Sequence, residues 1–322
     1  MIVCVAAAPS IDRIITVQRL DPGAIHRPLE VVAVPGGKGL NVARAAATLG
    51  AQVSVVALLA GHAGNWIDDA LRAEGIERRI TWTDGETRTC LSVADRETEE
   101  LTQFYETARP AGSSGWAGLT AMVDQAIAAI STGAKRHWLT ISGSLPADAP
   151  TDGYAVLIAS ARRAGMGCAL DTSGPILERS LEAQPDVTKI NAAEASEALA
   201  APCATLDDTF RAAIELRRRA GGDGHCAIIT RGPLGAVCVC PDGSAWKGRT
   251  AVKGAYPVGS GDAFLAGLVH GLESHNSWPL ALALALGAAG ANAEIPGAGR
   301  FLRERATSLA KGAHVVPVRL SS

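Results

Sequence analysis

Short apolar runs alternate along much of the chain with longer segments in which apolar residues recur at helical spacing. The runs predict strands and the longer segments predict helices. Strands are expected over residues 2–8, 53–59, 137–142 and 167–171, and helices over 40–49, 66–73, 117–130, 154–164, 261–272, 279–293 and 301–311. This alternation indicates an α/β fold, in which a mostly parallel sheet lies between helices and ligands bind at the carboxyl ends of the strands.

Two stretches break the alternation, because their apolar residues recur at every second position and no helix separates them. They predict four further strands, over residues 11–17, 29–34, 87–94 and 99–105. These strands cannot extend the parallel core. We therefore expect a small β-sheet lid, formed by residues 10–34 and 84–110, over a polar cleft. The alternative is a pair of hairpins without a function.

Composition narrows the class of protein. The 322 residues are 48% hydrophobic, 4% aromatic and 19% charged, which is typical of a close-packed α/β enzyme and suits one domain over residues 1–322. A net charge of −2 provides no basic field for nucleic acid or anionic lipid. The longest apolar stretch, residues 281–293, is shorter than the ~20 residues of a membrane span. Seven scattered cysteines indicate buried, reduced thiols, so we expect a cytoplasmic protein that binds neither nucleic acid nor membrane.

The strongest local signal is a glycine-rich turn before a helix, Val258-Gly259-Ser260-Gly261-Asp262-Ala263-Phe264. The backbone N–H groups of Gly259, Ser260 and Gly261 can point at a transferring phosphoryl group, since a helix N-terminus favours negative charge. Asp262 would accept the proton of the hydroxyl that attacks phosphorus. Because Asp is also a favoured N-cap residue, the turn alone explains Asp262 equally well as a helix cap.

A second glycine turn leads into a helix at Pro35-Gly36-Gly37-Lys38-Gly39-Leu40-Asn41-Val42-Ala43-Arg44. Lys38 and Asn41 can hydrogen-bond hydroxyls or a phosphate there. Neither glycine site has the spacing of a P-loop or of a dinucleotide-binding loop. The common nucleotide-binding motifs are therefore disfavoured, and with them a nicotinamide-dependent oxidoreductase.

Together the two glycine sites resemble the signatures of the ribokinase-like carbohydrate kinases, in the phosphofructokinase B (PfkB) branch. The resemblance covers nearly the whole chain, because the motifs occur in the family's order and at similar intervals. These motifs are residues 35–44, 142–146, 171–174, 189–194 and 259–262. The resemblance implies a ribokinase-like three-layer α/β/α domain with a small β-sheet lid.

The form Gly-Gly-Lys-Gly-x-Asn, followed by Gly85-Glu86-Thr87-Arg88-Thr89, resembles the family members that phosphorylate an already phosphorylated ketohexose. A guanidinium on a lid strand suits a substrate phosphate. The resemblance therefore implies that Arg88 and Arg27 bind this phosphate. The sugar contacts that it implies are Asp12, Gly36, Gly37, Lys38, Asn41 and Ser144.

For the nucleotide, the resemblance implies ATP with Mg²⁺, whose waters Glu194 would help to organise. The implied nucleotide contacts are Lys189, Asn191, Glu194, Thr230, Gly232, Gly235 and Asn292. Many relatives also hold a monovalent cation, K⁺. Pro257 alters the loop that would form this cation site, so its retention stays open.

We expect the chain to transfer the γ-phosphoryl group of ATP to a ketohexose phosphate, giving a bisphosphate, with Asp262 as the general base. Fructose 1-phosphate is the first choice of substrate, followed by tagatose 6-phosphate and fructose 6-phosphate. One alternative is a kinase for an unphosphorylated sugar or a nucleoside. Another is a sugar-phosphate sensor without turnover. The exposed edges of the lid sheet favour a homodimer through the lid.

Overall fold

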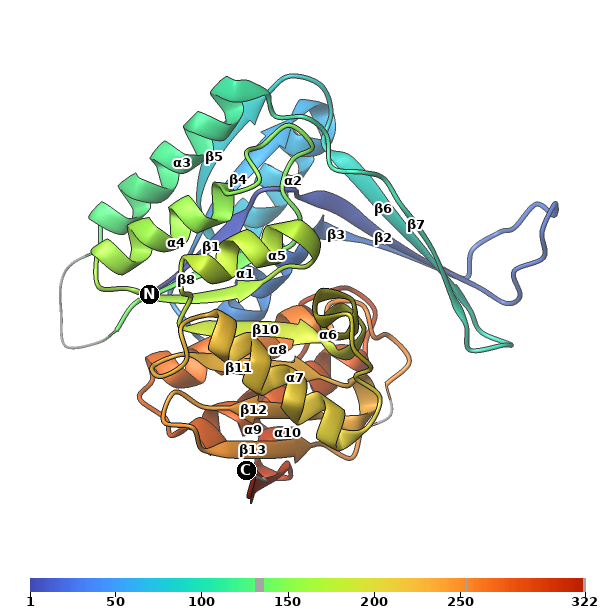
Figure 1. The fold of residues 1–322 in the computed structure, drawn as a ribbon. Coiled ribbons are helices and arrows are strands. Elements are labelled where there is room, and N and C mark those ends of the chain that lie inside the picture. Colours follow the sequence, from blue (N-terminus) through green and yellow to red (C-terminus); the bar gives the residue numbers. More distant parts are fainter. Residues whose placement is uncertain (131–135, 253, 321–322) are drawn as a thin grey trace.

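The computed structural model describes residues 1–130, 136–252 and 254–320. A ten-stranded sheet runs through the described chain in the order β14-β13-β12-β11-β10-β9-β8-β1-β4-β5 (Figure 1). Its neighbours pair in parallel from β11 to β5, whereas β12, β13 and β14 are antiparallel to the strands beside them. The strands are β1 (Ile2–Ala6), β4 (Val53–Ala60), β5 (Glu77–Thr83), β8 (Trp138–Ser142), β9 (Gly167–Asp171), β10 (Val187–Asn191), β11 (Cys226–Thr230), β12 (Ala236–Val239), β13 (Ala245–Arg249) and β14 (His314–Val318).

Helices cover both faces of this sheet. One face carries α1 (Lys38–Leu49), α2 (Gly61–Ala73), α8 (Ser260–Glu273), α9 (Trp278–Ala293) and α10 (Arg303–Lys311). The other carries α3 (Gly112–Ala128), α4 (Gly153–Arg163), α5 (Gly174–Glu182), α6 (Ala192–Leu199) and α7 (Leu206–Arg219). Successive side chains of a strand point to opposite faces, so Ile2 and Cys4 join the first core while Val3 and Val5 join the second. The predicted α/β fold, with a mostly parallel sheet between helices, is therefore confirmed.

The four strands predicted from apolar residues at every second position form a separate small sheet, in the order β3-β2-β6-β7. This sheet projects from the main body (Figure 1). They are β2 (Ser10–Val17), β3 (Glu30–Gly36), β6 (Arg88–Asp95) and β7 (Leu101–Tyr105). Thr87 fixes the base of β6 to the end of β4. Its N–H donates to the Ala60 carbonyl oxygen at 3.0 Å, and its Oγ1 accepts from the Ala60 N–H at 2.8 Å. The base of the small sheet is thus attached to the main sheet.

Several elements differ from the prediction. β5 and β10 to β14 were not among the strands expected from the sequence. β5 is the last strand of the sheet, and its sequence, Glu-Arg-Arg-Ile-Thr-Trp-Thr, has the polar residues of a half-exposed edge. The helix α2 begins at Gly61 rather than at Trp66. Its first turn lacks large apolar residues. The Ala63 N–H in this turn donates to the carboxylate of Glu86, a distant contact that local sequence does not reveal.

The long apolar helix α9 packs between α8 and α10 in the first core. Within the described ranges, no helix is both long and apolar enough to cross a membrane. All seven cysteines are buried and carry free thiols, as expected.

Candidate active site

A cavity of about 710 Å³ lies at the carboxyl ends of the parallel strands. Ser142, Asn191 and Thr230, the last residues of β8, β10 and β11, line it, and the small sheet contributes Asp12 and Arg88. The cavity therefore lies where the sequence predicts that ligands bind. The cavity brings together side chains from sequence segments more than 200 residues apart, as the two glycine turns predicted.

The first glycine turn forms the N-terminus of α8. Gly259 adopts φ +80°, and a Cβ on it would lie 2.6 Å from the Ala298 Cβ, so only glycine fits. The Ser260 N–H donates to the Pro257 carbonyl oxygen at 3.1 Å. The N–H groups of Gly261 and Asp262 have no partner within the helix, since they belong to its first turn. These two N–H groups are therefore available to bind an anion, whereas the Ser260 N–H is already bonded within the loop.

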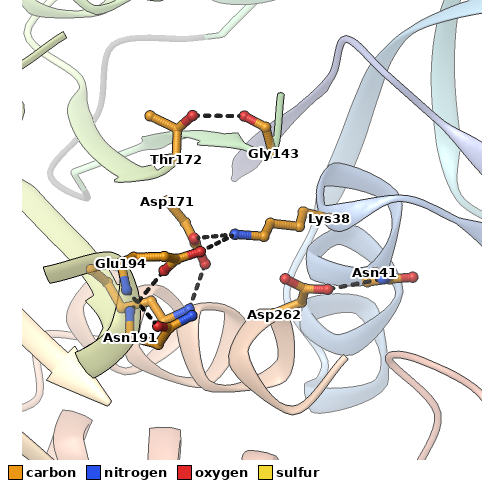
Figure 2. A network of polar contacts seen from close by, with 9 residues as sticks. Lys38, Asn41, Gly143, Asp171, Thr172, Asn191, Glu194 and Asp262 are labelled. Atoms are coloured by element: carbon orange, nitrogen blue, oxygen red, sulfur yellow. Dashed lines mark hydrogen bonds and ion pairs between the residues drawn. The ribbon is translucent and has the colours of Figure 1, made fainter. Parts of the chain in front are cut away.

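Asp262 is not the cap of this helix. Gly259 occupies the N-cap position without a side-chain cap, and one carboxylate oxygen of Asp262, Oδ2, accepts from the Asn41 Nδ2 at 2.8 Å (Figure 2). The side chain is buried, and burial together with the negative charge of Asp171 raises its pKa from 3.8 to about 7. Lys38, Lys189 and Asn41 oppose this shift. A carboxyl with this pKa can take up a proton near neutral pH.

A fully buried carboxylate, Asp171, ties the centre of the site together (Figure 2). Its Oδ1 accepts from Lys38 Nζ at 2.8 Å and its Oδ2 accepts from Lys189 Nζ at 2.5 Å. Burial alone would raise the pKa of Asp171, but the two ammonium groups hold it below its ordinary value. Lys38 also donates to Glu194 Oε1 at 3.4 Å, and these carboxylates keep the pKa of Lys38 raised against the effect of its burial.

At the small-sheet end, Asp12 and Arg88 line the cavity. The Asp12 carboxylate accepts from the Ser10 hydroxyl at 2.6 Å and from the Gly37 N–H at 3.4 Å, and burial raises its pKa. Arg88 donates from Nη1 to the Glu106 carbonyl oxygen at 2.8 Å and from Nη2 to the Ala8 carbonyl oxygen at 2.9 Å. These two bonds hold a cationic group at this end of the cavity.

At the opposite end, Asn191 and Glu194 form a capping box at the start of α6. The Glu194 N–H donates to the Asn191 Oδ1 at 2.9 Å, and the Asn191 N–H donates to Glu194 Oε2 at 2.8 Å. Both side chains line the cavity, so the cap also fixes the Glu194 carboxylate there. The predicted Thr230, Gly232 and Gly235 line the same end.

Three of the predicted site residues do not line the cavity. Gly36 lies behind Asp12, whose Cγ would be 2.0 Å from a Cβ on Gly36. Arg27 lies on the exposed loop between β2 and β3. Asn292 is fully buried and holds the α8 turn, because its Nδ2 donates to the Val258 carbonyl oxygen at 2.8 Å and its Oδ1 accepts from the Gly299 N–H. The remaining predicted residues, Asp12, Gly37, Lys38, Asn41, Arg88, Ser144, Lys189, Asn191, Glu194, Thr230, Gly232, Gly235, Gly259, Ser260, Gly261 and Asp262, all line it.

Other site residues were not singled out from the sequence. Asp171 stood within a recognised motif, but without a role; a charged residue at the end of an otherwise apolar strand was the available signal. Cys90, Gln103 and Tyr105 line the small-sheet side. No local signal marks these three residues, because strand alternation gives the face on which they lie but not what that face covers.

Comparison with known proteins identifies the class. The model of the pfkB family of carbohydrate kinases matches residues 1–305. A 1-phosphofructokinase of Rhodobacter capsulatus is 33% identical over 293 residues, which cover 90% of each chain. A 1-phosphofructokinase of Xanthomonas campestris pv. campestris is 33% identical over 276 residues, 84% of this chain and 83% of that protein.

Solved structures agree on the fold. Phosphofructokinase-2 from Escherichia coli, in complex with substrates and products, superposes with a TM-score of 0.86 at 24% identity, over 96% of this chain and 98% of that one. The same enzyme in complex with potassium gives a TM-score of 0.85 at 24% identity, over 97% and 98% of the chains. The ribokinase-like fold predicted from the sequence is confirmed.

The family match and the two relatives define a phosphotransferase that acts on an alcohol acceptor. More particularly, the chain belongs to the pfkB family of carbohydrate kinases. Membership in this family implies ATP and a divalent metal ion.

The donor groups of the site suit a metal that is held mainly by phosphates and water. Among the residues that the structure describes, no cluster of three or more His, Cys, Asp or Glu side chains could hold a metal by itself. The one carboxylate that Glu194 presents to the cavity is a typical protein contribution to an Mg²⁺–nucleotide site.

The pKa of Asp262 gives a stability prediction. Between pH 3.8 and about 7 the folded protein keeps a proton on this carboxyl that the unfolded chain has lost, so this group lowers the free energy of unfolding as pH rises through that window. Asp262→Asn removes the effect. In calorimetry, the free energy of unfolding of the variant minus that of the wild type should rise by about 2 kcal/mol or more from pH 5 to pH 8. A stability difference that does not change with pH would contradict the raised pKa.

Proposed function

We propose that the chain catalyses ATP-dependent phosphorylation of a ketohexose phosphate to the bisphosphate, with fructose 1-phosphate as the preferred acceptor. The observation that carries the proposal is the buried Asp262 carboxyl at the N-terminus of α8, in the same cavity as the Arg88 guanidinium. The first group suits proton abstraction and the second suits a phosphate. The 1-phosphofructokinase names of the two relatives at 33% identity support the choice of sugar.

In the proposed reaction, an acceptor hydroxyl lies against Asp262. Asn41 binds Oδ2 of the carboxylate, which leaves Oδ1 to take the proton of the hydroxyl. The acceptor oxygen forms a bond to the γ-phosphorus as the bond to the β-phosphate oxygen breaks, and ADP leaves. The amides of Gly261 and Asp262 then stabilise the charge on the phosphoryl oxygens.

Arg88 is the proposed holder of the substrate phosphate. Its two backbone hydrogen bonds fix the guanidinium before substrate arrives, which lowers the entropic cost of binding. We assign the phosphate to Arg88 alone, since Arg27 lies on an exposed loop outside the cavity. Asp12, Gly37 and Ser144 remain the proposed contacts of the sugar hydroxyls, and closure of the small sheet as a lid would exclude water.

ATP is proposed to occupy the end of the cavity lined by Asn191, Thr230, Gly232 and Gly235. Mg²⁺, bound to the phosphates, would neutralise their charge, with Glu194 positioning its waters.

A coupled assay of ADP release tests the proposal directly. With Mg-ATP and a panel of fructose 1-phosphate, tagatose 6-phosphate, fructose 6-phosphate and the free sugars, fructose 1-phosphate should give the highest kcat/KM. Asp262→Asn should lower kcat roughly 10²–10⁴-fold, because the attacking hydroxyl loses its base. No turnover with any acceptor would instead indicate a sensor, and near-normal turnover in the variant would remove Asp262 from the role of base.

Arg88→Ala separates a sugar-phosphate kinase from a kinase for an unphosphorylated sugar or a nucleoside. Loss of two charge-assisted hydrogen bonds should raise KM for the sugar phosphate about 10- to 100-fold. Arg13→Ala is the matched control, because Arg13 is an exposed arginine of the same small sheet that does not line the cavity. An unchanged KM in Arg88→Ala would favour the unphosphorylated acceptor.

We further propose that two copies associate through their small sheets. Five large apolar side chains are exposed on this sheet and on the loop between β2 and β3, namely Ile25, Leu29, Val31, Phe104 and Tyr105. Light scattering should give twice the mass of one chain, and Val31→Asp should halve it. Leu280→Asp, at an exposed leucine of α9, should leave the mass unchanged. A monomeric wild type would contradict the proposal.

A further inference from the structure

The path of the Lys38 side chain is unexpected for a residue predicted to contact the sugar. Lys38 is the first residue of α1, beside the small sheet, but its stem passes over Gly143, where an added Cβ would lie 3.4 Å from the Lys38 Cβ. Its ammonium group ends at Asp171 and Glu194, on β9 and α6 (Figure 2). It therefore points across the cavity, away from Asp12 and Arg88.

A second lysine reaches the same carboxylate from the other side. Lys189 Nζ binds the second oxygen of Asp171, and it would lie 2.9 Å from a Cβ on Gly261 in the first turn of α8. Lys38 in turn is close enough to Asp262, also in that turn, for each to affect the pKa of the other. Two ammonium groups thus flank the helix N-terminus that we propose to receive the phosphoryl group.

The hydrogen-bonding capacity of Lys38 also suits a contact with the phosphoryl group at this helix N-terminus. An ammonium group has three N–H donors. Asp171 and Glu194 take two of them, and the side chain keeps about a third of its surface (35%) exposed to the cavity. One donor of a fixed cation is therefore left for a ligand oxygen.

We propose that Lys38 is a catalytic residue that donates a hydrogen bond to the transferring γ-phosphoryl group, rather than a contact of the sugar hydroxyls. This inference rests on the proposed kinase function. As the acceptor oxygen bonds to phosphorus, the γ-phosphorus to β-oxygen bond breaks and the hydroxyl proton passes to Asp262. The equatorial oxygens of the phosphoryl group carry negative charge throughout. Lys38 and the helix amides stabilise that charge, and Asp171 keeps the ammonium in place between turnovers.

Lys38→Met tests the proposal through two separate readouts. The first is the split between kcat and KM for the sugar phosphate: kcat should fall about 10²- to 10³-fold while KM changes less than about threefold. The second is the slow hydrolysis of Mg-ATP without any sugar, in which water is the acceptor. It should fall by a similar factor, since the same phosphoryl group is transferred.

The variant should fold, because Asp171 keeps Lys189 as its partner, and its Tm verifies this. Lys38→Arg, which retains a cation, should recover part of the lost kcat. The matched control is Lys247→Met, at an exposed lysine of β13 that does not line the cavity, and it should leave both activities unchanged.

Two results would overturn the role of Lys38. One is a KM for the sugar phosphate raised tenfold or more with nearly unchanged kcat, the signature of a sugar contact. The other is unaltered hydrolysis of Mg-ATP in a folded Lys38→Met variant. Failure of the kinase proposal looks different, because the wild type would then phosphorylate no sugar phosphate, whereas the hydrolysis comparison would still report on Lys38.

Discussion

The pairing of one buried carboxylate, Asp171, with two lysines is the interaction on which the site depends. Asp171 is fully buried, and an isolated carboxylate in that position would lose its charge. Because Lys38 and Lys189 hold it ionised, the carboxylate fixes two positive charges that start on different elements, α1 and β10. The second glycine turn, which leads into α1, the parallel strands and the start of α8 are thereby held around one point.

The negative charge of Asp171 also contributes to the raised pKa of Asp262. The lysines limit the rise so that the carboxyl titrates near neutrality. A group buried in this way lowers the stability of the folded protein at the pH where it is ionised, and that cost is common at active sites. The network therefore couples two carboxylates with opposite pKa shifts, one a structural counterion and the other the proposed base.

Another buried cation, Arg44, bonds to the segments around this network. Arg44, on α1, donates to the Pro35 carbonyl oxygen at the base of the small sheet and to the Ala298 carbonyl oxygen beside Gly259. It also pairs with Glu74 at the end of α2. One helix thus connects the small sheet to the α8 turn, so the small-sheet end of the cavity and the α8 turn rest on a common support.

Much of this arrangement was predictable from the sequence, and the remainder depends on contacts between distant segments. Period-two alternation identified the four strands of the small sheet, and the glycine turns identified Asp262 and Lys38. The sequence did not show that Lys38 reaches across the cavity, because that depends on the space left by Gly143. Nor did it show that Asn292 is buried behind the α8 turn, since a polar residue in an apolar helix is compatible with either position.

The most direct measurement of the central claim is the pH dependence of kcat/KM for the preferred sugar phosphate. If Asp262 accepts the proton with a pKa of about 7, kcat/KM should be level above that pH. Below it, kcat/KM should fall about tenfold for each pH unit. A value of kcat/KM that stays constant down to pH 5 would contradict the account.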